Sequence, residues 1–202
     1  MKARAVVDVS ELPSVGFGPQ APLWWGVLGL FAIEGTMFAL VMASYFYLRL
    51  NFKEWPPSNF GFPDLGPGTA NMIILLLSVW PMAWIEKAAM RHEQRKVQIG
   101  MILASLIGLA CIVLRCYEFP AMKCRWDSHA YGSVVWTVLG LHMFHLITST
   151  GENILLAVYT FIRDIDEKHQ LDLAVNSVYW YFVVASWLPI YIIIYYAPRW
   201  LN

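Results

Sequence analysis

Charged residues are scarce in this sequence, and their scarcity points to one class of protein. Asp, Glu, Lys and Arg make up 14% of the 202 residues, whereas a soluble domain of ordinary composition carries about a quarter. Hydrophobic residues make up 58% of the chain, against about half in soluble domains. This balance is typical of an integral membrane protein and argues against an ordinary soluble enzyme.

The chain also has no excess of basic residues and no cysteine pair at metal-binding spacing. Its formal net charge is zero, and because nucleic-acid binding needs a basic face to neutralise phosphates, we expect no nucleic-acid partner. The three cysteines, Cys111, Cys116 and Cys124, form neither a Cys-x-x-Cys pair nor a Cys/His cluster. We therefore interpret them as structural or incidental thiols and expect no metal site in this chain.

What the sequence does have is a series of long apolar runs. A bilayer core is about 30 Å thick and a helix rises about 1.5 Å per residue, so about 20 apolar residues cross it. The sequence predicts five such spans, at residues 24–48, 69–86, 97–119, 131–162 and 174–197. The first span is longer than the apolar region of a signal peptide, so we expect it to remain as an anchor. The predicted fold is an all-α integral membrane protein, a bundle of five transmembrane helices.

The order of the spans divides the chain into two parts. Residues 1–23 form a predicted cytoplasmic segment at the amino terminus, and residues 24–202 form a single five-helix transmembrane domain. The connection at residues 51–68 is rich in Pro and Gly, and we predict a non-helical loop there, outside the membrane.

Basic residues predict the orientation. The amino-terminal segment and the second and fourth connections carry eight Lys and Arg residues, whereas the first and third connections and the carboxyl terminus carry five. The positive-inside rule therefore places the amino terminus in the cytoplasm and the carboxyl terminus on the opposite side. We expect the membrane to be a bacterial or archaeal cell membrane.

Glu34 is an ionisable residue inside the first span. It lies about ten residues into that span, roughly 15 Å deep by helical rise. An ionised carboxylate at that depth costs several kcal/mol unless it has a partner. The sequence leaves two interpretations open, a hydrogen bond to a neighbouring helix or a role in handling lipid or protons.

His142 and His145 lie three residues apart in the fourth span and therefore share a helix face. Two imidazoles can belong to a metal site, but two ligands do not complete one, and no motif nearby supplies a third. We therefore favour buried histidines that bond to other helices.

Glu152 lies one to two turns further along the same span. Together with Glu34 and Glu118 it could form the chain of carboxylates that a proton path needs. The alternative is a hydrogen bond to Asn153, to Thr148 or to a neighbouring chain.

Arg115 and Glu118 lie three residues apart at the end of the third span. That spacing suits an ion pair, which lowers the free-energy cost of burying both charges. The alternative is that the planar guanidinium of Arg115 contacts a lipid phosphate.

Small residues recur at helical spacing in two of the spans. Such residues let two helices approach closely, so both sets permit close helix contacts. They are Gly26, Gly29 and Gly35 in the first span, and Gly100, Ala104 and Gly108 in the third.

Several motifs follow one another in an order that resembles subunit III of the haem-copper terminal oxidases. The resemblance covers residues 24–198 and matches the short five-helix form of that family. The motifs are the segment from Phe31 to Phe38 around Glu34, the segment from Gly68 to Asn71, the segment from Arg115 to Phe119, Asp127 with Tyr131-Gly132-Ser133, and the segment from Gly140 to His145.

The resemblance implies a non-catalytic accessory subunit of a respiratory oxygen reductase of the cytochrome c oxidase type. Such a subunit packs against the catalytic subunit I and other oxidase subunits, stabilises the catalytic subunit, binds phospholipid and supports aerobic electron transport. Haem and copper are expected in the partner and not in this chain. The site residues that we expect are Glu34, Asn71, Arg115, Glu118, Asp127, His142, His145 and Glu152, with Glu34, Arg115, His142 and His145 as lipid contacts.

The chain departs from the family pattern at identifiable places. The long form of the family has seven helices, and only its last five resemble this chain, so the two-helix bundle that helps enclose a lipid-filled cleft is absent or comes from another subunit. Tyr181 and Val184 stand where the family usually has a histidine and an aspartate, and Ser149 stands where it has a glycine.

Two other functions remain as alternatives. An accessory protein of nitric oxide reduction has the same five-helix form and similar motifs. A small proton-coupled transporter would use Glu34, Glu118 and Glu152, although such proteins often show an internal repeat and broken helices, and this sequence has no convincing repeat.

Overall fold

The fold is a set of long helices. A computed structural model describes residues 21–57 and 60–200, except for the side chains at 167 and 168. Most of the predicted segment at 1–23 lies outside these residues. The helices are α1 (Pro22–Asn51), α2 (Leu65–Met90), α3 (Gln94–Ala121), α4 (Ala130–Ile162) and α5 (Glu167–Tyr191), followed by a π-helical turn, η1 (Ile192–Tyr196), and a short α6 (Ala197–Trp200).

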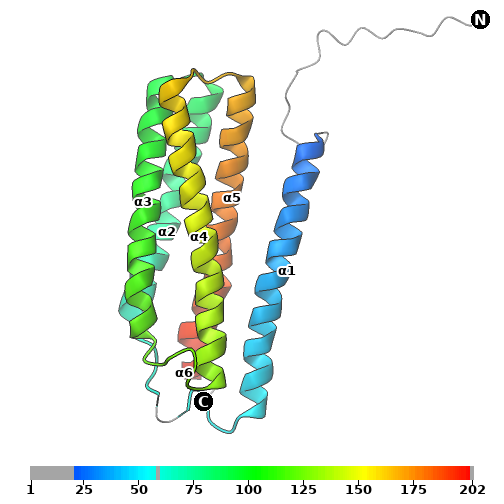
Figure 1. The fold of residues 1–202 in the computed structure, drawn as a ribbon, viewed down its shortest axis with the longest axis vertical. Helices are drawn as coiled ribbons and strands as arrows, with labels where there is room; N and C mark the ends of the chain where they lie inside the picture. Colours follow the sequence, from blue (N-terminus) through cyan, green and yellow to red (C-terminus); the bar gives the residue numbers. More distant parts are fainter. Residues whose placement is uncertain (1–20, 58–59, 201–202) are drawn as a thin grey trace, which may run out of the picture.

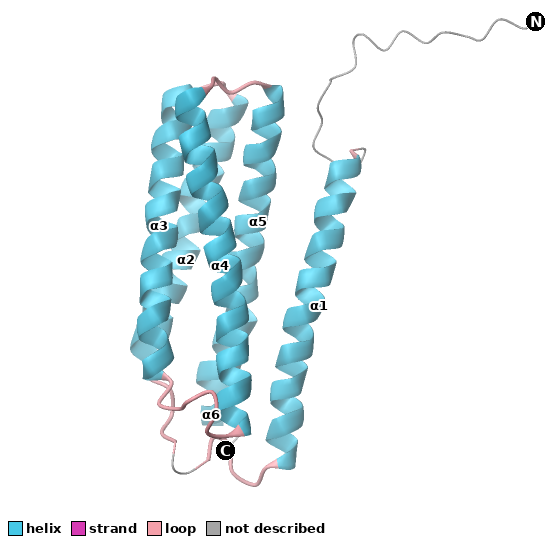
Figure 2. Cartoon of the chain, in the orientation of Figure 1, coloured by secondary structure: helices cyan, strands magenta, loops and turns pink. Residues whose placement is uncertain are grey.

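The predicted all-α, five-span membrane architecture is confirmed. Five helices of the described chain are long and apolar enough to cross a membrane, and its remaining residues are loops and turns at the helix ends (Figure 2). Each helix extends beyond the predicted apolar span at one or both ends. The additional helical residues are not all apolar, so a prediction based on apolar runs does not include them.

The predicted loop at 51–68 is wrong at its carboxyl end. Helix α2 already begins at Leu65, so Pro67 lies in its first turn. Proline is tolerated there because the first amide groups of a helix have no intrahelical acceptor. Pro22 occupies the corresponding place at the start of α1.

Helices α2, α3, α4 and α5 form a four-helix bundle, and α1 stands beside it (Figure 1). Within the bundle α2 packs on α3 and α5, and α4 packs on the same two helices. Helix α1 contacts only α4 and α5 to an appreciable extent. Consecutive helices run in opposite directions, so α1, α3 and α5 begin at one end of the molecule, and α2 and α4 begin at the other (Figure 1).

The two sets of small residues behave differently. A Cβ atom on Gly100 would lie 2.4 Å from Ile85, and one on Gly108 would lie 2.4 Å from the Thr150 hydroxyl, so the helix contacts predicted for α3 are confirmed. The glycines of α1 make no such contact with the described residues, because a Cβ atom on Gly26, Gly29 or Gly35 would have no neighbour within 4 Å among them. Close contacts at glycines therefore occur within the four-helix bundle, whereas the buried residues of α1 include large side chains such as Phe38 and Tyr45.

Candidate functional site

An enclosed charge network lies inside the four-helix bundle. Arg115 and Glu118, both on α3, have fully buried side chains, and Arg115 Nη1 donates to Glu118 Oε2 at 2.7 Å. The hydroxyl of Tyr195 donates to the other oxygen, Glu118 Oε1, at 2.5 Å. The predicted ion pair is confirmed, and the two opposite charges compensate one another in a place that water does not reach.

His142 on α4 continues this network in its neutral form. Its Nε2 lies 3.0 Å from the carbonyl of Val183 on α5, which can only accept, so Nε2 carries the proton. Its Nδ1 lies 3.0 Å from Arg115 Nη2, which can only donate, so Nδ1 is an acceptor. The ring is therefore the Nε2-protonated imidazole, and it links three helices.

Trp187 on α5 covers the network. The Arg115 guanidinium carbon lies 3.7 Å from the centre of the Trp187 ring system, a cation–π contact, and the His142 ring centroid lies 4.9 Å from it. Arg115 and His142 are both fully buried, so neither side chain reaches the outer surface of this chain where a lipid would lie.

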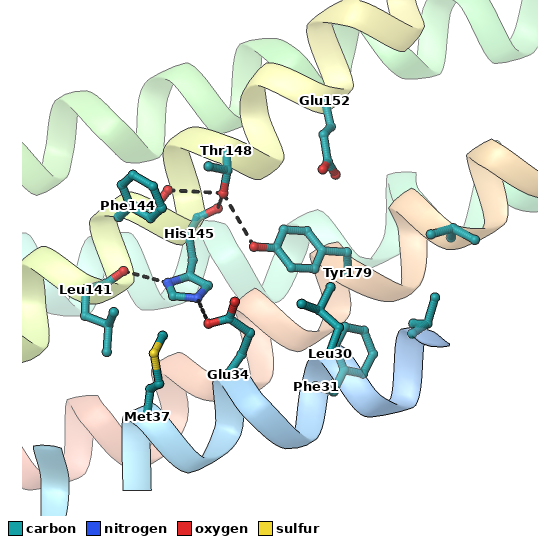
Figure 3. Close-up of a pocket in the computed structure, with 12 residues that line it drawn as sticks. Leu30, Phe31, Glu34, Met37, Leu141, Phe144, His145, Thr148, Glu152 and Tyr179 are labelled. Atoms are coloured by element: carbon teal, nitrogen blue, oxygen red, sulfur yellow. Dashed lines mark hydrogen bonds and ion pairs between the residues drawn. The ribbon is translucent and has the colours of Figure 1, made fainter. Parts of the chain in front are cut away.

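Glu34 and His145 form a second polar pair, between α1 and α4. Glu34 Oε2 lies 2.7 Å from His145 Nε2, and His145 Nδ1 donates to the carbonyl of Leu141 at 2.7 Å (Figure 3). Of the two interpretations left open for Glu34, the structure shows the hydrogen bond to a neighbouring helix, and both histidines bond to other helices as expected. Since Nδ1 already carries a proton, the contact at Nε2 holds one further proton, which either the carboxyl or the imidazole carries.

The Glu34–His145 pair faces a cleft. The cleft has a volume of about 460 Å³ and lies where α1 meets α4 and α5. The Glu34 side chain is 20% exposed in it, whereas that of His145 is 4% exposed. Most of the wall is apolar, with Leu30, Phe31 and Met37 from α1 and Leu141 and Phe144 from α4, and Figure 3 shows Phe31 beside Tyr179 of α5.

A phenylalanine separates the two polar sites. Phe38 on α1 is 3% exposed, and its ring centroid lies 4.9 Å from that of His145 and 6.3 Å from that of His142. Two histidines that share one helix face therefore belong to different environments, one enclosed and one open to the cleft.

The three carboxylates that the sequence suggested as a proton path do not all come together. Glu34 and Glu152 line the same cleft, with Tyr179 lying between them in Figure 3. Glu118 is sealed inside the bundle by Arg115 and Tyr195.

Asn71 lies in the bundle interior on α2. It is fully buried, and neither atom of its side-chain amide has a hydrogen-bond partner among the described residues. It shares the inward face of α2 with Gly68, where a Cβ atom would collide with the Tyr195 ring at 2.4 Å.

Asp127 lies outside the membrane-spanning helices, in the connection between α3 and α4. Arg125 Nε and Nη2 donate to its two carboxylate oxygens at 3.0 and 2.9 Å, and these hydrogen bonds lower the pKa of the Asp127 carboxyl. Ser133 Oγ donates to the Trp126 carbonyl at 2.7 Å, and a Cβ atom on Gly132 would lie 2.1 Å from the Arg125 carbonyl. This motif therefore folds the loop tightly against the start of α4.

The thiols occupy ordinary positions. All three cysteines are free, with Cys111 and Cys124 buried and Cys116 exposed on α3. Burial raises the pKa of the Cys124 thiol, in the same loop as Asp127, to about 11, so this thiol stays protonated at neutral pH. Across the residues that the structure describes, no three His, Cys, Asp or Glu side chains are grouped as a metal site would require.

Sequence reasoning missed the partners that α5 and η1 supply. The Val183 carbonyl and Trp187 lie four residues apart on α5, and Tyr195 follows eight residues later in η1. Their helical spacing was the available signal, but an aromatic stripe at this spacing is common in any packed helix. The hydrogen bond from Asn176 to Asn153 inside the bundle, at 2.8 Å, was also missed, because the sequence analysis considered Asn153 only as a partner of Glu152.

Comparison with known proteins connects this arrangement to a family. The family profile described as Cytochrome c oxidase subunit III matches residues 19–199. The protein named Cytochrome c oxidase subunit 3 in Drosophila melanogaster is 23% identical over 180 residues, which cover 86% of this chain and 69% of that protein. The protein of that name in Podospora anserina is 26% identical over 188 residues, covering 88% and 68%. The one in Spodoptera frugiperda is 25% identical over 143 residues, covering 70% and 97%. The chain belongs to the cytochrome c oxidase subunit III family.

Proposed function

We propose that this chain is a non-catalytic subunit of a respiratory haem-copper oxygen reductase, where it stabilises the catalytic subunit and supports aerobic electron transport. The family match over residues 19–199 carries the proposal. Haem and copper belong to the partner subunits in this view. The enclosed network supports a structural role, because every charged group in it is used in binding another helix of the same chain.

The outer surface of the chain suits partners within the membrane. Large apolar side chains point outward on several helices, among them Trp80 at 75% exposed and Leu155 at 71%. Such side chains contact either lipid tails or the apolar helices of another subunit. The proposed protein partners are the catalytic subunit and other subunits of the reductase.

The cleft is the proposed phospholipid site. Its largely apolar wall fits acyl chains, and Glu34 and His145 offer polar contacts within it. Arg115 and His142 lie behind Phe38 and Trp187 and bond to one another, so the lipid contacts that we propose are confined to Glu34 and His145.

The proposed orientation has the amino terminus in the cytoplasm of a bacterial or archaeal cell. The connections at 91–93 and 163–166 lie at the same end as the start of α1, in agreement with five alternating helices. Two cysteine substitutions that leave the charge unchanged test this orientation, at the exposed residues Trp126 and Met90. Both substitutions are made in a background in which the exposed Cys116 is replaced by Ser. In intact cells, an impermeant maleimide should label Trp126→Cys and not Met90→Cys, whereas the reverse pattern would invert the orientation.

The experiment that tests the function is gentle detergent purification through a tag on this chain. A visible spectrum and mass spectrometry then identify what co-purifies. Haem bands, a large catalytic subunit and oxygen consumption would support the proposal. Co-purification of nitric oxide reductase subunits would instead favour an accessory role in nitric oxide reduction. A colourless protein that purifies without partners would refute the proposed function.

Lipid binding has its own test, with a matched pair of variants on α1. Leu30 lines the cleft, and Leu40 lies outside it at 63% exposed. Leu30→Trp should fill the cleft and lower the number of phospholipids that co-purify per chain, whereas Leu40→Trp should leave that number unchanged. Equal lipid content in both variants and the unmodified protein would remove the cleft as the lipid site.

A further inference from the structure

Three fully buried side chains of the four-helix bundle, Asn71, Arg115 and Trp187, carry polar atoms without a hydrogen-bond partner. Among the described residues, no partner reaches Arg115 Nε, Trp187 Nε1 or either polar atom of the Asn71 amide. Leaving a buried donor or acceptor unbonded costs free energy, so such atoms are ordinarily bonded to protein or to ordered water. Where several of them lie together, they indicate a bound ligand.

Two of these atoms belong to side chains that are in contact. The Arg115 guanidinium carbon lies 3.7 Å from the centre of the Trp187 ring system. The other two nitrogens of the guanidinium are used, because Nη1 donates to Glu118 and Nη2 donates to His142. The Nε–H of Arg115 and the Nε1–H of Trp187 are therefore two unbonded donors on neighbouring side chains.

Asn71 on α2 lies at the same level of the bundle. Near the start of α2, Gly68 packs against the ring of Tyr195, whose hydroxyl donates to Glu118. Helices α2 and α3 run in opposite directions (Figure 1). Asn71 is therefore about one turn inward from Gly68, just as Arg115 is about one turn inward from Glu118.

The contact between α2 and α3 nearer their other ends gives the same register. Ile85 of α2 lies against Gly100 of α3. Asn71 comes 14 residues before Ile85, and Arg115 comes 15 residues after Gly100. By helical rise, both are roughly 21–23 Å along their helices from that contact. Because Asn71 is also fully buried, its amide lies inside the bundle at the level of Arg115.

The unbonded atoms match the hydrogen-bonding capacity of a water molecule. The charge of Arg115 is already compensated by Glu118, so an ion would add an uncompensated charge to the bundle interior. A water oxygen can accept from both Arg115 Nε and Trp187 Nε1, and a water proton can be donated to Asn71 Oδ1. Three polar partners are the usual number for a buried water molecule.

We propose that the four-helix bundle holds an ordered water molecule between Asn71, Arg115 and Trp187. Through this water, α2 joins the charge network that α3, α4 and α5 form by direct hydrogen bonds. Asn71 is then a positioning residue, which holds the Arg115 guanidinium against Trp187. The inference goes beyond the proposed function and holds for this chain whichever complex it joins.

The test is the transfer of magnetisation from water protons to tryptophan indole groups, measured by solid-state NMR. The full chain, with the partners that co-purify, is labelled with nitrogen-15 at tryptophan and placed in lipid bilayers. The signal of the Trp187 indole is the one that Trp187→Phe removes from the spectrum. A water molecule bonded to Nε1 should give strong transfer to this signal at short mixing times.

Trp180 is the matched control within the same protein. It also lies on α5 and is 1% exposed, but its Nε1 donates to Ser78 Oγ at 2.8 Å. Its signal is identified by Trp180→Phe, and transfer to it should be much weaker because its partner belongs to the protein.

Two asparagine substitutions then test the position of the water. Asn71→Leu removes the acceptor and fills the space beside Arg115, so it should lower the transfer to Trp187 to the level of Trp180. Asn153→Leu removes another fully buried amide, one that is bonded to Asn176, and should leave the transfer to Trp187 unchanged.

Strong transfer to Trp187 that is lost in Asn71→Leu and kept in Asn153→Leu supports the water site. Equally weak transfer to both tryptophans in the unmodified protein would overturn it, as would transfer to Trp187 that Asn71→Leu leaves unchanged. If Asn71→Leu does not assemble, the comparison of the two tryptophans in the unmodified protein decides the proposal. Because the readout is independent of haem, oxygen consumption and lipid content, failure here is distinct from failure of the proposed function.

Discussion

Two histidines one helical turn apart have opposite surroundings in this protein. His142 is fully buried, with Arg115 on one nitrogen and a backbone carbonyl on the other. His145 bonds to Glu34 at the edge of a cleft. The difference shows that the role of a buried polar residue depends on its bonding partners. A histidine whose two ring nitrogens are both bonded inside the bundle has a structural role, whereas a histidine bonded to a residue at the edge of a cleft leaves a proton or a ligand site accessible from that cleft.

The largest expected effect comes from breaking the enclosed network. Glu118→Gln removes one charge of a fully buried pair and leaves Arg115 uncompensated. We expect the free energy of unfolding to fall by about 3–5 kcal/mol, measured by denaturation in mixed micelles.

A double-mutant cycle controls that measurement. Arg115→Met alone should be similarly harmful, because it leaves Glu118 as the uncompensated charge. The combination of both substitutions should cost clearly less than the sum of the two. Strict additivity would show that the ion pair is not the origin of the loss.

The effect at the cleft should be smaller. Glu34→Gln keeps a polar group against His145 and lies where the side chain is 20% exposed, so we expect a loss of about 2 kcal/mol or less. The same denaturation assay measures it. A loss as large as that of Glu118→Gln would remove the distinction between the two sites.

The smallest effect belongs to the exposed pair in the loop between α3 and α4. Hydrogen bonds from Arg125 lower the pKa of Asp127 in the folded protein. The stabilisation they provide is therefore present above the pKa of Asp127 in the unfolded chain and is lost as the pH falls through the lowered value. Asp127→Asn should be slightly less stable than the unmodified protein at neutral pH and equal to it in acid. A difference that grows toward low pH would contradict this assignment.

The sequence could predict the features that depend on local spacing. Arg115 and Glu118 pair across one helical turn, and the five apolar spans are five helices. The depth of Glu34 required a partner from another helix, and the bond to His145 supplies it. In each case the prediction follows from residues that are close together in the sequence or from the burial cost of a single side chain.

Other features depend on how the helices pack against one another, and this packing cannot be predicted from a single sequence. The glycines of α1 recur at helical intervals, as do Gly100 and Gly108 of α3, but α1 stands beside the bundle. A Cβ atom on any of the α1 glycines would have no neighbour within 4 Å among the described residues. The covering of Arg115 by Trp187 and the bond from Tyr195 to Glu118 depend on how α5 and η1 are rotated against α3. The separation of Glu118 from Glu34 and Glu152 follows from the same packing.

The most direct test of the whole account compares the reductase from cells that contain this chain with the reductase from cells that lack it. The proposed non-catalytic role predicts that loss of the chain leaves the haem spectrum and the initial rate of oxygen consumption of the purified catalytic subunit essentially intact. The yield of assembled complex and the number of turnovers before inactivation should both fall, and the unmodified chain should restore them. Loss of the haem spectrum, or an unchanged yield and lifetime without the chain, would contradict the account.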